Sequence, residues 1–177
     1  MAAFAPLASV LSFAPPTPAA RRRAGAAVAS LLVGDAVLHA VWASGVTWPA
    51  DSTATLSQGL LNADVPFTPQ VLLPLVVVLT TAATCVYAHA HAWGGARIRA
   101  LVHLVTGAVA VGLTVRAIAG VVWAFGIGAD SGSTFYRLNL LVYTPVCIGF
   151  GYAAARLARG GRSRTAGILR RARVAGE

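Results

Sequence analysis

GDAVLHAVWASG, residues 34–45, lies inside a long apolar run and contains two ionisable side chains, Asp35 and His39. Together with Trp42 they follow the spacing i, i+4, i+7, which places all three on one face of an α-helix. A charged side chain inside an apolar helix is costly and by default marks a functional site or a structurally paired group. This stretch therefore predicts a transmembrane helix with one polar face.

The composition of the whole chain is typical of a membrane protein. Of the 177 residues, 57% are hydrophobic and 11% are charged, whereas soluble domains have about 25% charged residues. So few polar residues cannot cover a soluble core, and lipid is the expected solvent. The net charge of +9 comes from arginines near the chain ends and between apolar runs. Arginines so placed indicate membrane topology and contact with anionic headgroups, not a nucleic-acid partner.

Four apolar segments are each close to the ~20 residues that a helix needs to cross the hydrocarbon core. A sheet would have to close into a barrel in lipid, and no alternating pattern supports one. The sequence predicts an all-α polytopic membrane protein, four transmembrane helices in an antiparallel bundle. The expected parts are a disordered N-terminal tail (1–24), a transmembrane domain (25–158) with spans of about 25–47, 70–93, 98–126 and 136–158, and an Arg-rich C-terminal tail (159–177).

The arginines also predict the orientation, because cytoplasmic loops are enriched in Lys and Arg. Neither the loop at 48–69 nor the loop at 127–135 contains a basic residue. Both termini and both tails are therefore expected in the cytoplasm. The arginines on the cytoplasmic side are Arg21, Arg22, Arg23, Arg97, Arg99, Arg156, Arg159, Arg162, Arg164, Arg170, Arg171 and Arg173.

Small residues and prolines are expected to affect how closely these helices pack and where they bend. The spans are rich in Ala and Gly, which favour close helix contacts, and Pro74 and Pro145 are expected to kink their helices or to lie in first turns. Candidates for close helix contacts are Gly107, Gly112, Gly149 and Gly151.

Two segments outside the spans have open interpretations. Residues 48–69 are either a plain linker or a lid over an outward-facing cavity, since long ordered loops tend to be functional. In the C-terminal tail, Ile168, Leu169 and Val174 give a weak apolar side. That tail is expected to lie on the anionic inner leaflet.

Polar residues of three spans are expected to meet in the outer half of the membrane. Counting ~1.5 Å per residue places Asp35 near mid-membrane and His39 farther out. Arg116 in the third span and Asn139 and Tyr143 in the fourth lie at a similar depth. Asp35 and Arg116 could alternatively form only an ion pair that fixes helix register. The predicted roof of this outward-opening cluster is Trp42, Trp48 or Trp123, and Trp93 is assigned to an interfacial belt.

Haem binding is a rival interpretation, because two histidines on facing helices of a membrane bundle can ligate iron. His39 lies in the outer half, whereas three other histidines lie near the inner end. The feasible pairs are His89 or His91 with His103. The leading interpretation requires neither a cofactor nor a metal.

Other chemistry has little support from motifs. The sequence contains no Walker-type loop, G-x-S-x-G, H-E-x-x-H or C-x-x-C, which are signatures of several enzyme classes. Cys85 and Cys147 lie in apolar runs and are expected to be buried free thiols. A His with Asp and Arg can still perform acid–base chemistry, with Arg stabilising developing negative charge.

Three short blocks contain the predicted cluster: HAVWASG (39–45) followed by Trp48, RAIAG (116–120), and Asn139 followed by YTPVC (143–147). In this order, each in its own span, they resemble the domain-of-unknown-function family 3995 over about residues 25–155. The resemblance implies a small four-span membrane protein with this polar site, located in the inner membrane of a bacterial cell. It implies no activity, because none is assigned to the family.

The chain departs from the family pattern at two positions. Asn139 stands where the family tends to have Asp, and Thr144 stands where it has Ser. If that Asp pairs with the arginine in relatives, Asp35 is expected to take its place here.

The leading functional hypothesis is a small intramembrane pocket for a hydrophobic, isoprenoid- or lipid-like molecule, which is bound and transformed by acid–base chemistry. His39 would transfer the proton, Asp35 would orient it, Arg116 would bind an anionic or carbonyl oxygen, and Tyr143 would donate a hydrogen bond. The predicted site residues are His39, Asp35, Arg116 and Tyr143 for catalysis and Trp42, Asn139 and Trp123 for substrate binding.

In a second hypothesis, the chain is a structural or accessory membrane subunit, or a small transport component. The polar cluster then only holds the helices together, and we call this role a packing latch. The two hypotheses differ on whether the chain is an enzyme. Expected partners are membrane lipids, the hydrophobic molecule, and a second copy or a partner membrane subunit.

Overall fold

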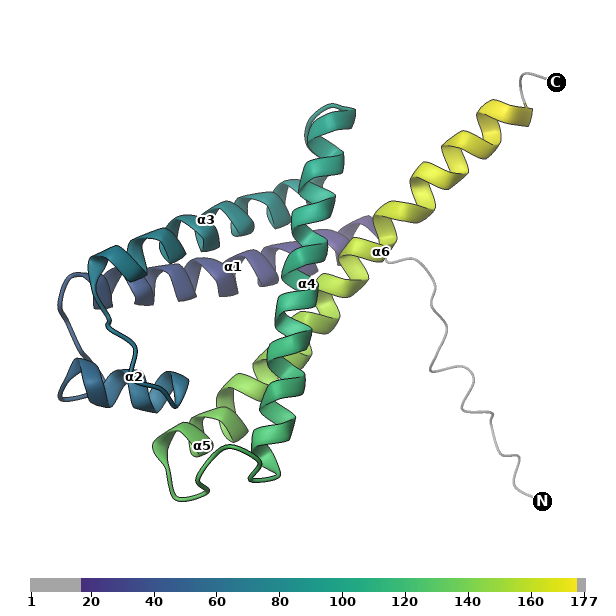
Figure 1. Cartoon of the computed structure of the whole chain (residues 1–177). Coiled ribbons are helices and arrows are strands. Elements are labelled where there is room, and N and C mark those ends of the chain that lie inside the picture. Colours follow the sequence, from purple (N-terminus) through teal and green to yellow (C-terminus); the bar gives the residue numbers. More distant parts are fainter. Residues whose placement is uncertain (1–16, 175–177) are drawn as a thin grey trace, which may run out of the picture.

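The computed structural model describes residues 17–174, with side chains as far as Gly160, and consists of helices and their connections (Figure 1). No strand occurs among these described residues, so the predicted all-α fold is confirmed. Four segments are long and apolar enough to cross a membrane: Pro18–Ala43, Pro69–His91, Ala96–Ala124 and Thr134–Gly160. The elements are α1 (Pro18–Ala43), α2 (Thr53–Leu61), α3 (Pro69–His91), α4 (Ala96–Ala124), α5 (Thr134–Leu138), the π-helix η2 (Asn139–Tyr143) and α6 (Thr144–Val174).

The first span begins earlier than the sequence predicts, whereas the other three agree within two residues at each end. Thr17 Oγ1 accepts the Ala20 N–H at 3.2 Å, and Pro18 occupies the start of the helix, where its missing N–H costs nothing. Residues 18–24 are therefore helical, and for them the prediction of a disordered tail is wrong. Residues 1–16 lie outside the described residues.

The C-terminal segment differs in a similar way. The backbone of α6 continues as one helix through Val174, past the predicted span end at residue 158. The predicted 159–177 tail is thus, as far as Val174, a continuation of the fourth span's helix. Residues 175–177 lie outside the described residues.

The four long helices form two antiparallel pairs that cross each other (Figure 1). α1 packs along α3, and α4 packs along α6. Smaller contacts of α3 with α4 and of α1 with α6 join the pairs. The predicted antiparallel order of neighbouring spans is confirmed, and the crossing of the two pairs is a feature that hydropathy does not predict.

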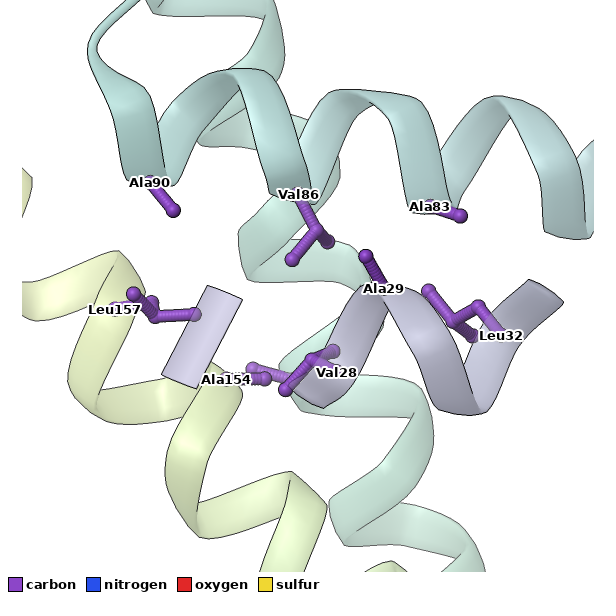
Figure 2. Close-up of a cluster of buried hydrophobic side chains, with 9 residues drawn as sticks. Val28, Ala29, Leu32, Ala83, Val86, Ala90, Ala154 and Leu157 are labelled. Atoms are coloured by element: carbon purple, nitrogen blue, oxygen red, sulfur yellow. The ribbon is translucent and has the colours of Figure 1, made fainter. Parts of the chain in front are cut away.

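Small side chains fill the region where the pairs cross (Figure 2). A Cβ on Gly25 of α1 would overlap the Cβ of Ala90 on α3, so glycine is required for this approach. Gly151 contacts α4 as predicted, since a Cβ there would lie 3.4 Å from Leu113 Cβ. The other three predicted contact glycines, Gly107, Gly112 and Gly149, face open space. The core is made of Val28, Ala29, Leu32, Ala83, Val86, Ala90, Ala110, Ala154 and Leu157.

The 48–69 segment is folded, not a plain linker, because it contains α2. Ser52 Oγ caps the helix by accepting the Thr55 N–H at 3.2 Å, and Asn62 ends it in the left-handed conformation with φ 53°. Leu56 packs against Trp42, and the Asn62 Nδ2 donates to the Gly128 carbonyl at 3.1 Å. Through these contacts α2 connects the α1–α3 pair to the loop that follows α4.

The opposite end of the molecule is tied together by buried polar contacts. The Arg21 guanidinium of α1 donates to the carbonyl of His89, in the last turn of α3. His89 Nε2 lies 3.2 Å from the Leu157 carbonyl of α6, and its ring centroid lies 5.3 Å from that of His103 in α4. All four long helices therefore meet here. We call this the arginine end, after Arg21, Arg22, Arg23, Arg97, Arg99, Arg156 and Arg159, and the opposite end the α2 end.

Candidate functional site

Asn139 is the centre of the polar contacts between α4 and the fourth span. Its side chain is fully buried, and its Oδ1 accepts a 3.0 Å hydrogen bond from Arg116 Nη1. Thr144 Oγ1 donates to the same Oδ1 at 3.3 Å, and Asn139 Nδ2 donates to the Gly120 carbonyl at 2.9 Å. One amide thereby joins α4, η2 and the start of α6. We call Arg116, Gly120, Asn139 and Thr144 the Asn139 cluster.

The π-helix explains how these residues reach one another. Thr144 lies five residues after Asn139, a spacing that an α-helix rotates onto different faces. In η2 the Thr144 N–H donates to the Asn139 carbonyl, and Pro145 has no N–H to offer the Leu141 carbonyl. The wider turn brings the Asn139 and Thr144 side chains together, and such π-turns are frequent at functional sites.

Gly120 permits the close approach of α4 to this turn. A Cβ built on Gly120 would overlap Thr144 Oγ1 and would lie 3.1 Å from Asn139 Oδ1. The absence of a side chain therefore lets the Asn139 amide reach the Gly120 carbonyl. This residue and Thr144 are functional-site residues that the spacing argument missed.

Arg116 is held by neutral groups. Its guanidinium carbon lies 4.9 Å from the Trp123 ring centroid and 5.3 Å from that of Tyr143, within the range of cation–π contacts. Its hydrogen bond goes to the uncharged Asn139 amide. Within the described part of the chain, Arg116 forms no ion pair with a carboxylate. The half-buried positive charge is therefore uncompensated by the described chain.

The acid–histidine pair of α1 is separate from these contacts. His39 Nδ1 lies 3.3 Å from Asp35 Oδ1 and 2.8 Å from the Asp35 carbonyl oxygen. The side chain of His39 is 16% exposed and that of Asp35 is 46% exposed, so the carboxylate is the more accessible of the two. Since Nδ1 is directed to Asp35, Nε2 is the ring nitrogen left for another proton donor or acceptor.

Trp42 covers this pair on the side toward the α2 end. Its ring meets His39 edge-on, with centroids 5.2 Å apart, and its Nε1 donates to the Trp48 carbonyl at 3.0 Å. Trp42 is buried against Leu56 and Phe67, whereas the Trp48 side chain is 70% exposed. Of the predicted roof residues, Trp42 thus covers His39, while Trp48 contributes mainly its backbone.

The structure divides the predicted polar cluster into two separate halves. Arg116, Asn139 and Tyr143 form one half, and Asp35 and His39 form the other.

The suggested ion pair between Asp35 and Arg116 is wrong, because no such pair forms in the described structure. The expectation that Asp35 replaces a family aspartate beside the arginine is wrong as well. Asn139 itself occupies that place, and Asp35 contacts His39 instead.

The histidines of the haem interpretation lie at the arginine end. His89 and His103 come together, but His89 is 5% exposed and its Nε2 faces the Leu157 carbonyl. His91 stacks on Tyr87, with ring centroids 4.1 Å apart. In the described part of the chain, no group of three or more His, Cys, Asp or Glu side chains is arranged to hold a metal ion. Cys85 and Cys147 are free thiols.

These features define a membrane protein with four helical spans, a polar cluster between α4 and the fourth span, and an Asp–His pair on α1. The chain belongs to a family described as proteins of unknown function (DUF3995), whose model matches residues 32–154. The matched range includes both halves of the site, from Asp35 to Cys147, and confirms the family resemblance. No curated protein and no solved structure matches the chain.

Proposed function

We propose that this chain binds a small amphipathic molecule within the membrane, with an apolar body and an anionic or carbonyl head that meets Arg116. In this proposal the head lies between the two halves of the site. The apolar body lies among the lipid-facing side chains, as an isoprenoid- or lipid-like molecule would. His39, oriented by Asp35, then exchanges a proton with the bound head, while Tyr143 donates a hydrogen bond to it.

The uncompensated charge of Arg116 is the observation that supports this proposal most. An arginine at the centre of a membrane helix costs about 2.5–3.5 kcal/mol in insertion experiments. The Asn139 oxygen and two aromatic faces reduce that cost but contribute no negative charge. An anionic or strongly polarised oxygen of a ligand would supply it, and arginine is well suited to bind such groups.

The geometry of His39 supports the proton-transfer step. A carboxylate at Nδ1 selects the tautomer that leaves Nε2 available, as in other histidine general bases. Asn139 is fully buried and its Oδ1 is occupied by Arg116 and Thr144. We therefore assign Asn139 to positioning Arg116 instead of to direct contact with the ligand.

Native mass spectrometry of the purified chain tests the binding proposal. We expect the wild type to retain a molecule of lipid-like mass, and Arg116→Met to lose most of it while remaining folded. Arg137→Met is the matched control, because Arg137 is exposed at the α2 end. Equal retention by the wild type and Arg116→Met would contradict the proposal.

A packing latch is the second candidate, and the saturated bonding of Asn139 favours it. A latch predicts that Asn139→Leu unfolds the protein and that His39→Gln changes nothing. The binding proposal instead predicts that Asp35→Asn and His39→Gln keep the fold and abolish proton transfer. Circular dichroism melting and ligand turnover, measured on the same variants, separate the two.

We also propose that the arginine end faces the cytoplasm of a bacterial cell and that the protein lies in the inner membrane. Except for Arg137, the described arginines near the ends of the spans lie at the arginine end. The α2 end has Asp51, Asp64 and Asp130. This charge asymmetry is the usual sign of a cytoplasmic face.

A further inference from the structure

A cavity of about 380 Å³ lies between α2 and α5 at the α2 end, outside the Asn139 cluster. Its volume is in the range of roughly 300–1,000 Å³ that is usual for small-molecule sites. Residues from both sides of the molecule form it, since α2 follows the first span and α5 begins the fourth. The Asn62–Gly128 hydrogen bond holds the two sides together at the edge of this cavity.

Three polar side chains of the lining are available to a ligand. Asp51, Gln58 and Thr134 make no side-chain hydrogen bond within the described part of the chain. In contrast, Thr55 and Ser133 are engaged with neighbouring groups of their own turns. The available groups therefore include one carboxylate, one amide and one hydroxyl.

The charge of the lining distinguishes it from the rest of the protein. The chain contains fourteen arginines, yet none lines this cavity, and Asp51 is its one charged residue. An anionic ligand would meet an unpaired carboxylate here, whereas a cation would form a charge-assisted hydrogen bond with it.

The remaining wall is apolar. Leu56, Leu60, Phe135 and Leu138 line the inner side, and Phe135 is held edge-on against Trp123 at a centroid distance of 5.1 Å. An apolar wall beside one carboxylate suits an amphiphile with a positive head.

We infer that the cavity between α2 and α5 binds the ammonium group of a small amphiphilic amine, with Asp51 as its counter-ion and its apolar part against Leu60 and Leu138. Gln58 and Thr134 supply further hydrogen-bond acceptors for the ammonium protons. A free amine and the ethanolamine headgroup of a lipid share this chemistry. The inference is independent of the proposed ligand of Arg116.

Isothermal titration calorimetry of the full chain in dodecyl maltoside tests whether this cavity binds an amine. The three probes are of similar size: phenethylammonium, phenethyl alcohol and 3-phenylpropionate. We expect saturable binding of phenethylammonium that is tighter than binding of the other two. Asp51→Asn should weaken it by at least about tenfold, the effect of one lost charge-assisted contact. Asp64→Asn, a second exposed carboxylate at the same end, should leave it unchanged.

A separate substitution tests whether the ligand binds in this cavity. Gly59 lines the cavity, and a Cβ there would meet only Thr134 Cγ2 at 3.7 Å, so a larger side chain extends into the space without breaking a core contact. Gly59→Leu should abolish binding of phenethylammonium. Unchanged binding in Gly59→Leu, equal effects of Asp51→Asn and Asp64→Asn, or equal affinity for 3-phenylpropionate would each overturn the inference.

Nanodiscs then separate the two sources of the ammonium group. If the natural ligand is a lipid headgroup, phosphatidylethanolamine added to phosphatidylglycerol discs will compete with phenethylammonium and raise its apparent Kd. If it is a free amine, the apparent Kd will be the same in both discs. Either result supports the site and identifies its ligand source.

Discussion

At the scale of single residues, the site depends on how an arginine is accommodated in an apolar helix. Arg116 meets one amide oxygen and two aromatic rings, and each ring contributes about 2 kcal/mol when it is desolvated. These contacts lower the cost of burial and leave the charge in place. Asn139 determines this outcome, because an aspartate at the same position would neutralise the guanidinium.

The packing of Gly120 leads to the first prediction. Gly120→Ala should destabilise the protein by about 1–3 kcal/mol, since the new methyl group overlaps Thr144 Oγ1 and separates Asn139 from Arg116. The measurement is the midpoint of thermal unfolding in detergent. Gly112→Ala, in the same helix but facing open space, is the control and should leave the midpoint unchanged. Equal midpoints for both variants would show that Gly120 is not needed for close packing.

The sequence predicts part of this site correctly. Arg116, Asn139 and Tyr143 do come together, because their depth in the membrane can be counted along the helices. Thr144 and Gly120 could not be found in this way. The first reaches Asn139 only through a π-turn, and the second acts through the space that its missing side chain leaves.

At the scale of the elements, hydropathy predicts the long helices and misses the short ones. The thickness of the hydrocarbon core requires a minimum length, so the last three spans end within two residues of the predicted positions. Neither α2, with nine residues, nor η2, with five, has such a constraint. Both depend on contacts with distant parts of the chain, which periodicity does not record.

The connection made by α2 can be tested through Asn62. Asn62→Gly preserves the left-handed conformation at φ 53° and removes the hydrogen bond to Gly128. We expect amide hydrogen exchange in Thr53–Leu61 to become several-fold faster, because α2 loses a contact with the loop after α4. Gln58→Ala, which removes no side-chain hydrogen bond in the described chain, is the control. Unchanged exchange in Asn62→Gly would mean that Leu56 packing alone holds α2.

At the scale of the whole molecule, two features decide how the protein sits in a membrane. The described arginines lie mainly at one end, and the two helix pairs cross near that end through buried alanine, valine and leucine side chains (Figures 1 and 2). The charge asymmetry is visible in the sequence. The crossing is not, because it depends on which residues of the two pairs pack together, such as Val28 of α1 with Ala154 of α6.

The proposed orientation predicts the behaviour of reporter fusions in bacteria. A fluorescent protein fused after Glu177 should fold and fluoresce, and alkaline phosphatase at the same place should be inactive, since that end is proposed to be cytoplasmic. Alkaline phosphatase inserted after Asp64, at the α2 end, should be active and serves as the control. The reverse pattern would contradict the orientation.

In the proposed function, the uncompensated charge of Arg116 recruits the negative or carbonyl oxygen of a ligand. The most direct test is native mass spectrometry of Asn139→Asp beside the wild type, with unfolding midpoints measured on the same samples. The new carboxylate would pair with Arg116 and give up the hydrogen bond to the Gly120 carbonyl, so the fold should persist. We predict that the variant remains folded and no longer retains the lipid-like mass. A folded Asn139→Asp protein that retains the ligand as well as the wild type does would contradict the claim.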